Sequence, residues 1–303
     1  MIVKDGYETL ATAVGLVARP GRAVLELVGS EAAEFLQGQV TNDVEALAPG
    51  EGCYAALLDH KGKLRTDLRV SRVEQDRLIV DAEPAGRRAL AHTFEMYSLG
   101  RQVTPRDVSD DRVVLSLIGP AARDLLAGAP PPTEHACVQG PLGVYVTTDL
   151  GVDLIVEATR EAEVREQLGA PEIPEEIAEV LRVEHGRPRL NLDMDSSTMP
   201  QEAGINERAV NFTKGCYVGQ ETVARLFYRG RPNRHMRGLK LSATAERGAP
   251  VMLGEKQVGA LGSVAISPTL GTIALALVRR EAEPGAEVLV DGSPATVVEL
   301  PFR

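Results

Sequence analysis

Residues 211–225 concentrate the side chains of this sequence that could do chemistry. Lys214 and Cys216 flank a glycine there, and Glu221 and Arg225 follow at a spacing of four residues. A thiolate is the nucleophilic and metal-binding form of cysteine, and a nearby cation favours it. The segment therefore predicts an active loop in which Cys216 is the reactive group. Lys214 would either tune that thiol or anchor an anion.

The residues around Cys216 also predict how it is positioned. Gly215 and Gly219 free the backbone for a close approach or a positive φ, and the residues from Gln220 onward are good helix formers. We therefore predict a loop that enters a helix near Gly219, so that the helix dipole favours a negative charge on the thiol. Free cysteines are more often small buried hydrophobes, and the residues by themselves leave both interpretations open.

Three motifs carry a resemblance to a known family. Residues 214–222 read Lys-Gly-Cys-Tyr-Val-Gly-Gln-Glu-Thr, which matches a K-G-C-x-x-G-Q-E signature. That signature resembles the YgfZ family, the folate-binding relatives of the glycine cleavage system T-protein. Residues 35–44 resemble the N-terminal motif of that family, and residues 182–186, Arg-Val-Glu-His-Gly, resemble its mid-chain R-x-E-x-G. The resemblance spans most of the chain.

Length and composition limit the classes of protein that remain. A chain of 303 residues exceeds a typical single core, so two or three domains are expected. The net charge of −10 argues against broad non-specific binding of nucleic acid. Three widely spaced cysteines without a C-x-x-C pair do not support a disulfide framework or a zinc finger. The acidic run at 191–198 lacks the spacing of an EF-hand and is predicted to be a surface loop, so no metal site is expected. With no apolar leader or membrane span, we expect a cytoplasmic protein without a membrane partner.

The order of elements indicates the fold. Four strand-then-helix units recur, at residues 24–38, 77–97, 113–126 and 152–168. They predict a duplicated α+β scaffold with mostly antiparallel sheets, as in ferredoxin-like halves. No G-x-G-x-x-G follows a predicted strand, which disfavours a dinucleotide-binding fold.

The remaining segments complete this expected architecture. Residues 52–73 predict a hairpin that turns at 59–62, and short strands separated by glycine turns from residue 238 onward predict a small β-barrel. The resemblance implies a T-protein-like fold with two interleaved ferredoxin-like α+β subdomains and a C-terminal β-barrel. We accordingly expect a folate-binding core at 1–230 and a barrel domain at 231–303.

The resemblance also implies residues that hold a folate. The T-protein hairpin ends in two aspartates, and here that pair is Thr66-Asp67, so Asp67 is the expected folate contact. Glu184 of the R-x-E-x-G motif is expected to grip the pterin, since adjacent ring N–H groups suit a bidentate carboxylate.

Further ligand contacts are implied on the same grounds. Glu202 and Gln220 are expected to line the ligand cleft. Arg225 and Arg229 are expected to hold the negatively charged glutamate tail.

The resemblance implies tetrahydrofolate, or a one-carbon-substituted folate, as the cofactor. It also implies a role in assembling or repairing iron–sulfur clusters in client enzymes, including tRNA-modifying ones. Cys216 would be a nucleophile, a redox thiol or a transient cluster ligand. The expected partners are folate and iron–sulfur client or assembly proteins.

Two alternatives come from other classes. One is a folate-dependent aminomethyl- or one-carbon transferase, which the loss of the second aspartate disfavours. The other is nucleic-acid binding by the arginines at 225–240. This is the weakest alternative because only Phe227 and Tyr228 interleave with them, and no direct nucleic-acid partner is expected.

Overall fold

The computed structural model describes the backbone of residues 2–302 and the side chains of residues 4–302. Its contacts divide the chain into two compact units. The first unit contains residues up to 60, 65–178 and 208–220, and the second contains 61–64, 179–207 and the chain from 221 onward. The second unit is thus larger than the barrel expected at 231–303, since it also takes in segments that hydrogen-bond to barrel strands.

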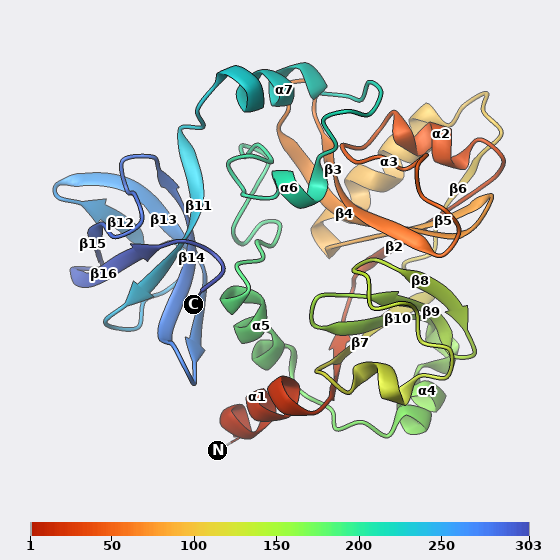
Figure 1. The fold of residues 1–303 in the computed structure, drawn as a ribbon, viewed down its shortest axis with the longest axis horizontal. Helices are drawn as coiled ribbons and strands as arrows, with labels where there is room; N and C mark the ends of the chain where they lie inside the picture. Colours follow the sequence, from red (N-terminus) through yellow and green to blue (C-terminus); the bar gives the residue numbers. More distant parts are fainter. Residues whose placement is uncertain (1, 303) are drawn as a thin grey trace. The chain divides into compact units, whose positions relative to one another are not determined.

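The first unit contains a five-stranded sheet in the order β3-β4-β5-β2-β6 (Figure 1). Its strands are β2 (Ala23–Val28), β3 (Glu51–Leu58), β4 (Leu64–Glu74), β5 (Arg77–Ala82) and β6 (Thr104–Asp107). Helices α2 (Ala32–Gln37) and α3 (Arg87–Tyr97), the latter preceded by the 3-10 turn η1 (Pro84–Gly86), cover one face. Phe35 and Phe94 meet edge to face there, with 5.9 Å between ring centroids. Leu25 and Leu27 face these helices, because alternate strand residues point to the same side.

The first unit also contains a second five-stranded sheet, in the order β1-β7-β10-β9-β8. Its strands are β1 (Gly15–Arg19), β7 (Arg112–Ile118), β8 (Cys137–Gly140), β9 (Gly143–Thr147) and β10 (Gly151–Glu157). The outer face packs on α4 (Glu161–Leu168), which the 3-10 turn η3 (Ala158–Arg160) precedes. The helix predicted at the end of the 113–126 unit is only the 3-10 turn η2 (Ala122–Leu125), because the backbone is already extended at Leu126.

The two sheets of the first unit stack face to face. Val24 and Ile79 of the first sheet share one cluster with Val114 and Ile155 of the second. Strand β1 precedes every strand of the first sheet in sequence but pairs with β7 in the second, so the two halves interleave. The predicted duplicated α+β scaffold with antiparallel sheets is therefore confirmed.

The second unit contains a closed barrel in the order β11-β14-β13-β12-β15-β16 (Figure 1). Its strands are β11 (Arg234–Leu241), β12 (Pro250–Leu253), β13 (Lys256–Ser267), β14 (Gly271–Arg279), β15 (Glu287–Val290) and β16 (Ser293–Val298). Strand β16 pairs with β11 and closes the barrel. The interior holds small and branched side chains, including Leu239, Val251, Ala276 and Val297. The predicted barrel is confirmed.

Four further helices complete the described chain: α1 (Ile2–Thr12), α5 (Glu175–Glu184), α6 (Asn206–Ala209) and α7 (Gln220–Arg229). None of the helices between residues 2 and 302 is long and apolar enough to cross a membrane.

The acidic 191–198 segment differs from the predicted surface loop at Asp193, whose side chain is fully buried. Its Oδ1 accepts a bond from Ser263 N at 2.7 Å, and its Oδ2 accepts one from Arg182 Nη1 at 3.0 Å. The prediction was wrong here because this carboxylate finds its partners in distant parts of the second unit, which spacing within the segment does not reveal.

Candidate functional site

Asp67 on β4 carries an unsatisfied carboxylate oxygen in the first unit. The hydroxyl of Tyr54, on the neighbouring β3, donates to Asp67 Oδ2 at 2.8 Å. Oδ1 is buried and has no hydrogen-bond partner among the described residues. Burial raises the pKa of the Asp67 carboxyl, and the bond from Tyr54 opposes that rise. The side chain thus has one buried, unpaired oxygen that can accept a hydrogen bond or hold a proton.

Thr66, the residue before it, points to the opposite face of the strand. Its side chain is fully buried, and its Oγ1 donates to the backbone oxygen of Asp67 at 2.7 Å. A Cβ on Gly86 would lie only 2.2 Å from that Oγ1, so the threonine fills the space beside a glycine. Of the two neighbours Thr66 and Asp67, only Asp67 therefore supplies a carboxylate to the site.

Arg208 on α6 lies over the ring of Tyr54, with 5.1 Å between its guanidinium carbon and the ring centroid. It also forms an ion pair with Glu134, whose carboxylate is 3.6 Å from His135 Nε2. His135 is largely buried, and burial lowers its pKa to about 4, so it is neutral at pH 7. Sequence reasoning missed these residues, since no motif connects them.

Asn42 of the 35–44 motif ties this cluster together. Its Nδ2 donates to the backbone oxygens of Tyr54 at 2.8 Å and Arg208 at 3.1 Å. Asn42 therefore has a structural role in the motif, because it holds β3 and α6 side by side. The 35–44 motif is therefore a signal in the sequence that could have drawn attention to the cluster, although the other residues of the cluster lie outside it.

Lys214 lies buried in the first unit, 8% exposed. Its Nζ donates to the backbone oxygens of Gln37 at 2.5 Å, Val40 at 2.7 Å and Asn42 at 3.0 Å. Burial lowers the pKa of this amine to about 8. An ammonium has three N–H donors, so these bonds use all of them. Lys214 was expected to anchor an anion or to tune the thiol, but its amine already donates to three backbone oxygens.

Cys216 is exposed, which excludes the buried-hydrophobe interpretation. Cys53 and Cys137 are buried, and burial raises the pKa of their thiols to about 12 and about 11. Gly219 has φ of 84°, and α7 begins directly after it, as predicted. Among the described residues, no group of three or more His, Cys, Asp or Glu side chains could hold a metal ion.

Glu202 in the second unit is buried and already paired. Its Oε1 accepts from Arg234 Nε at 3.0 Å, and its Oε2 accepts from Arg234 Nη2 at 3.0 Å and from Met199 N at 2.9 Å. Lys63 Nζ lies 3.4 Å from the same Oε2. This geometry favours a structural role for Glu202, which holds β11 to the 199–204 segment, over the expected ligand contact.

Glu184 is half-buried at the last residue of α5, and its backbone oxygen accepts a bond from Phe302 N at 2.9 Å. It lines a cavity of about 470 Å³ within the second unit.

Arg225 and Arg229 are exposed on α7. Of the predicted residues, the first unit contains Asp67, Lys214, Cys216 and Gln220, and the second contains Glu184, Glu202, Arg225 and Arg229.

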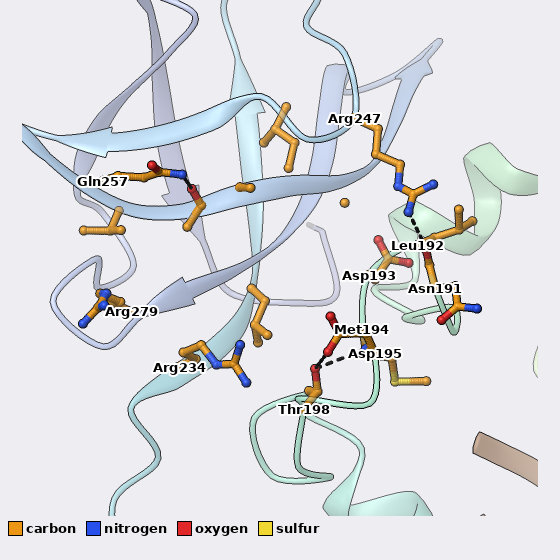
Figure 2. A pocket seen from close by; sticks show the side chains of 16 residues that line it. Asn191, Leu192, Asp193, Met194, Asp195, Thr198, Arg234, Arg247, Gln257 and Arg279 are labelled. Carbon is orange, nitrogen blue, oxygen red and sulfur yellow. Dashed lines mark hydrogen bonds between the residues drawn. The ribbon is translucent and has the colours of Figure 1, made fainter. Parts of the chain in front are cut away.

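A polar cavity of about 510 Å³ lies between the 191–198 segment and the barrel of the second unit (Figure 2). Arg234, Arg247 and Arg279 line it, and Arg247 donates to the backbone oxygen of Asn191. None of the predicted site residues borders this cavity.

Comparison with known families supports the fold. The family model described as "GCVT N-terminal domain" matches residues 2–138. The model described as "Glycine cleavage T-protein C-terminal barrel domain" matches residues 234–303. The crystal structure of the glycine cleavage system aminomethyltransferase T from Bartonella henselae superposes with a TM-score of 0.89. The superposition covers 99% of this chain and 89% of that one at 21% identity. The chain thus has a T-protein-like fold.

Curated relatives fall into two groups of similar strength. The chain is 28% identical to an "Aminomethyltransferase" of Prochlorococcus marinus, over 98% of this chain and 88% of the relative. It is 29% identical to a "tRNA-modifying protein YgfZ" of Pectobacterium carotovorum, over 71% of this chain and 67% of the relative. The similarity is therefore to a broad group that includes both T-proteins and YgfZ proteins.

Proposed function

From the T-protein-like fold and the unpaired carboxylate oxygen of Asp67, we propose that this protein binds tetrahydrofolate or a one-carbon-substituted folate. We further propose that the exposed thiol of Cys216 supports the assembly or repair of iron–sulfur clusters in client enzymes, including enzymes that modify tRNA. The fold is similar to that of a solved aminomethyltransferase, and a YgfZ relative is named as a tRNA-modifying protein.

The single observation that carries the folate proposal is Asp67 Oδ1, a buried acceptor without a partner among the described residues. Leaving such an atom unpaired costs about 1–3 kcal/mol, which a ligand N–H group would recover. Reduced folates carry several N–H groups on the pterin ring, so the acceptor fits this class of ligand. When bound, the folate supplies nitrogens that can carry a one-carbon unit.

Other residues have narrower parts in the proposal. Glu184 is proposed to grip the pterin, on the resemblance of its motif. The exposed guanidinium groups of Arg225 and Arg229 are proposed to pair with the carboxylates of the glutamate tail. Glu202 is assigned to structural support, since Arg234 engages both of its oxygens.

Cys216 is proposed to act together with a thiol from outside this chain. Iron–sulfur clusters need several thiolate ligands, and the other two cysteines are buried with raised pKa values. Cys216 would therefore hold a cluster or sulfur species only transiently, jointly with a client or assembly protein.

The test is a calorimetric titration of tetrahydrofolate into the wild type and into Asp67→Asn, Glu184→Gln and Cys216→Ser. We expect the wild type to bind, Asp67→Asn and Glu184→Gln to bind at least about tenfold more weakly, and Cys216→Ser to bind like the wild type. A tenfold loss corresponds to about 1.4 kcal/mol. Asp76→Asn, at an exposed turn, is the matched control. Absence of binding by the wild type would end the folate assignment.

A second candidate is folate-dependent aminomethyl transfer. It is favoured by relatives named aminomethyltransferase and by the retained Asp67. Formation of methylene-tetrahydrofolate from an aminomethyl donor, with release of the amine as ammonia, would favour this candidate if both products are lost in Asp67→Asn. Folate binding without turnover would favour the first.

A further inference from the structure

We infer that Lys214 is a positioning residue whose ammonium pins the loop that presents Cys216 to the turn following α2. The loop is residues 211–217, and the turn is residues 37–42. This inference deepens the proposed function, because it concerns the thiol on which that function rests. Lys214 would thus control where the Cys216 thiol lies and would not activate that thiol through its charge.

The acceptors of the ammonium explain why a lysine fits here. Gln37 is the last residue of α2, and carbonyls at a helix C-terminus lack partners within the helix. Val40 and Asn42 supply the other two carbonyl oxygens, from the turn itself. A cation near a helix C-terminus is also favoured by the helix dipole. Lys214 therefore completes the turn as well as tethering the loop.

The loop is also anchored just before the lysine. Asn211 donates its backbone N–H to the oxygen of Thr41 at 3.0 Å. Its Oδ1 accepts bonds from the backbone N–H groups of Thr213 at 2.8 Å and Lys214 at 3.0 Å. The backbone leading into Lys214 is thus fixed against the same 37–42 turn.

A second anchor follows the cysteine. Tyr217 is 7% exposed, and its ring centroid lies 5.2 Å from Lys214 Nζ. Gly215 and Cys216, between the two buried anchors, are both exposed. A Cβ on Gly215 would meet nothing within 4 Å. The tip therefore projects from the surface, and Lys214 and Tyr217 together set where the thiol lies.

The cage around the ammonium is made of carbonyl dipoles. The charged or titratable groups that act on it are Asp43, Glu45 and the Cys53 thiol, yet its three hydrogen bonds go to backbone oxygens. Carbonyl oxygens arranged in this way replace the hydration shell of a monovalent cation. Truncating Lys214 to alanine should leave a cage that ammonium ion can enter, whereas methionine fills the space without charge.

The test measures the rate at which iodoacetamide alkylates Cys216 and the hydrogen exchange of amides 211–217. Wild type, Lys214→Ala and Lys214→Met are compared in ammonium chloride and in choline chloride at equal ionic strength. In choline, we expect the amides of residues 211–217 to exchange at least about tenfold faster in both variants than in the wild type. The rate of Cys216 alkylation should also differ from that of the wild type in both variants. In ammonium, Lys214→Ala should recover toward wild type and Lys214→Met should not. Lys256→Ala, at an exposed barrel lysine, should behave as the wild type.

Two outcomes would overturn the inference: wild-type exchange in Lys214→Ala, or a loosened loop that ammonium leaves unchanged. The second outcome would mean that the aliphatic stem, and not the charge, holds the loop. If Lys214→Ala does not fold, Lys214→Gln, which keeps two neutral donors, takes its place and is expected to show partial protection that is insensitive to ammonium. Wild-type exchange in that variant would equally reject the inference. These readouts need neither folate nor a client protein, so they can fail while the folate titration succeeds, and the reverse.

Discussion

Arg69 and Asp153 lie in different stacked sheets of the first unit, and their Nη1 and Oδ2 atoms are 2.8 Å apart. The same guanidinium pairs with the fully buried Asp81, also at 2.8 Å. Ser116 donates to the other oxygen of Asp153 at 2.6 Å. A buried charge that loses its partner costs about 3–5 kcal/mol.

We therefore expect Arg69→Met to lower the free energy of unfolding by about 3–5 kcal/mol, because Asp153 would lose its cation and Asp81 would keep only Arg22, whose Nε lies 2.7 Å from its Oδ1. Asp153→Asn should cost less, since Arg69 keeps Asp81. Urea unfolding followed by circular dichroism measures both. An Arg69→Met protein as stable as the wild type would show that the pair contributes nothing net.

Acidification should destabilise the protein through His135. Burial lowers its pKa from 6.5 to about 4 in the fold, so between these values the unfolded chain binds a proton that the folded chain does not. Stability should fall as the pH drops from 6.5 to 4, by up to about 3 kcal/mol, and this contribution should be constant below that window.

The His135→Asn variant should lack this part of the pH dependence. Asparagine tolerates the positive φ of 70° at this position, so the backbone can stay as it is. His92→Asn, at an exposed position on α3, is the matched control and should keep the wild-type profile. Parallel profiles for wild type and His135→Asn would contradict the assignment.

Asp67→Asn should stabilise the ligand-free protein while weakening folate binding. The raised pKa of this carboxyl means that the folded state binds a proton more tightly than the unfolded state. Stability therefore falls as the pH rises from about 4 through the folded pKa, and the neutral amide avoids that loss. The melting temperature at pH 7 should be higher in Asp67→Asn than in wild type. A lower value would mean that the ionised carboxylate has partners that stabilise it.

Gly262→Ala should destabilise the second unit. A Cβ at Gly262 would lie 2.4 Å from Asp193 Oδ1 and 3.0 Å from the oxygen of Leu192, so the buried Asp193 carboxylate would have to leave Ser263. We expect a loss of about 1–3 kcal/mol, the cost of an unsatisfied buried group, measured by thermal unfolding. Gly215→Ala is the matched control, because its Cβ meets nothing within 4 Å.

The sequence by itself determined the elements whose signals are local. Short strands separated by glycine turns predicted the barrel, and a glycine before good helix formers predicted where α7 begins. The K-G-C signature identified the loop that carries the exposed thiol. These features depend on residues a few positions apart, which is the range over which turn chemistry and side-chain periodicity act.

Only the tertiary structure decided what those residues touch. Lys214 bonds to backbone oxygens more than 170 positions earlier in the chain, and a backbone oxygen leaves no mark in the sequence. Asp193 is buried because distant residues of the second unit satisfy it, although its own segment is acidic and polar. The unpaired oxygen of Asp67 likewise follows from how the surrounding elements bury it. Burial and hydrogen-bond satisfaction are long-range properties, because they exist only once the chain has closed on itself.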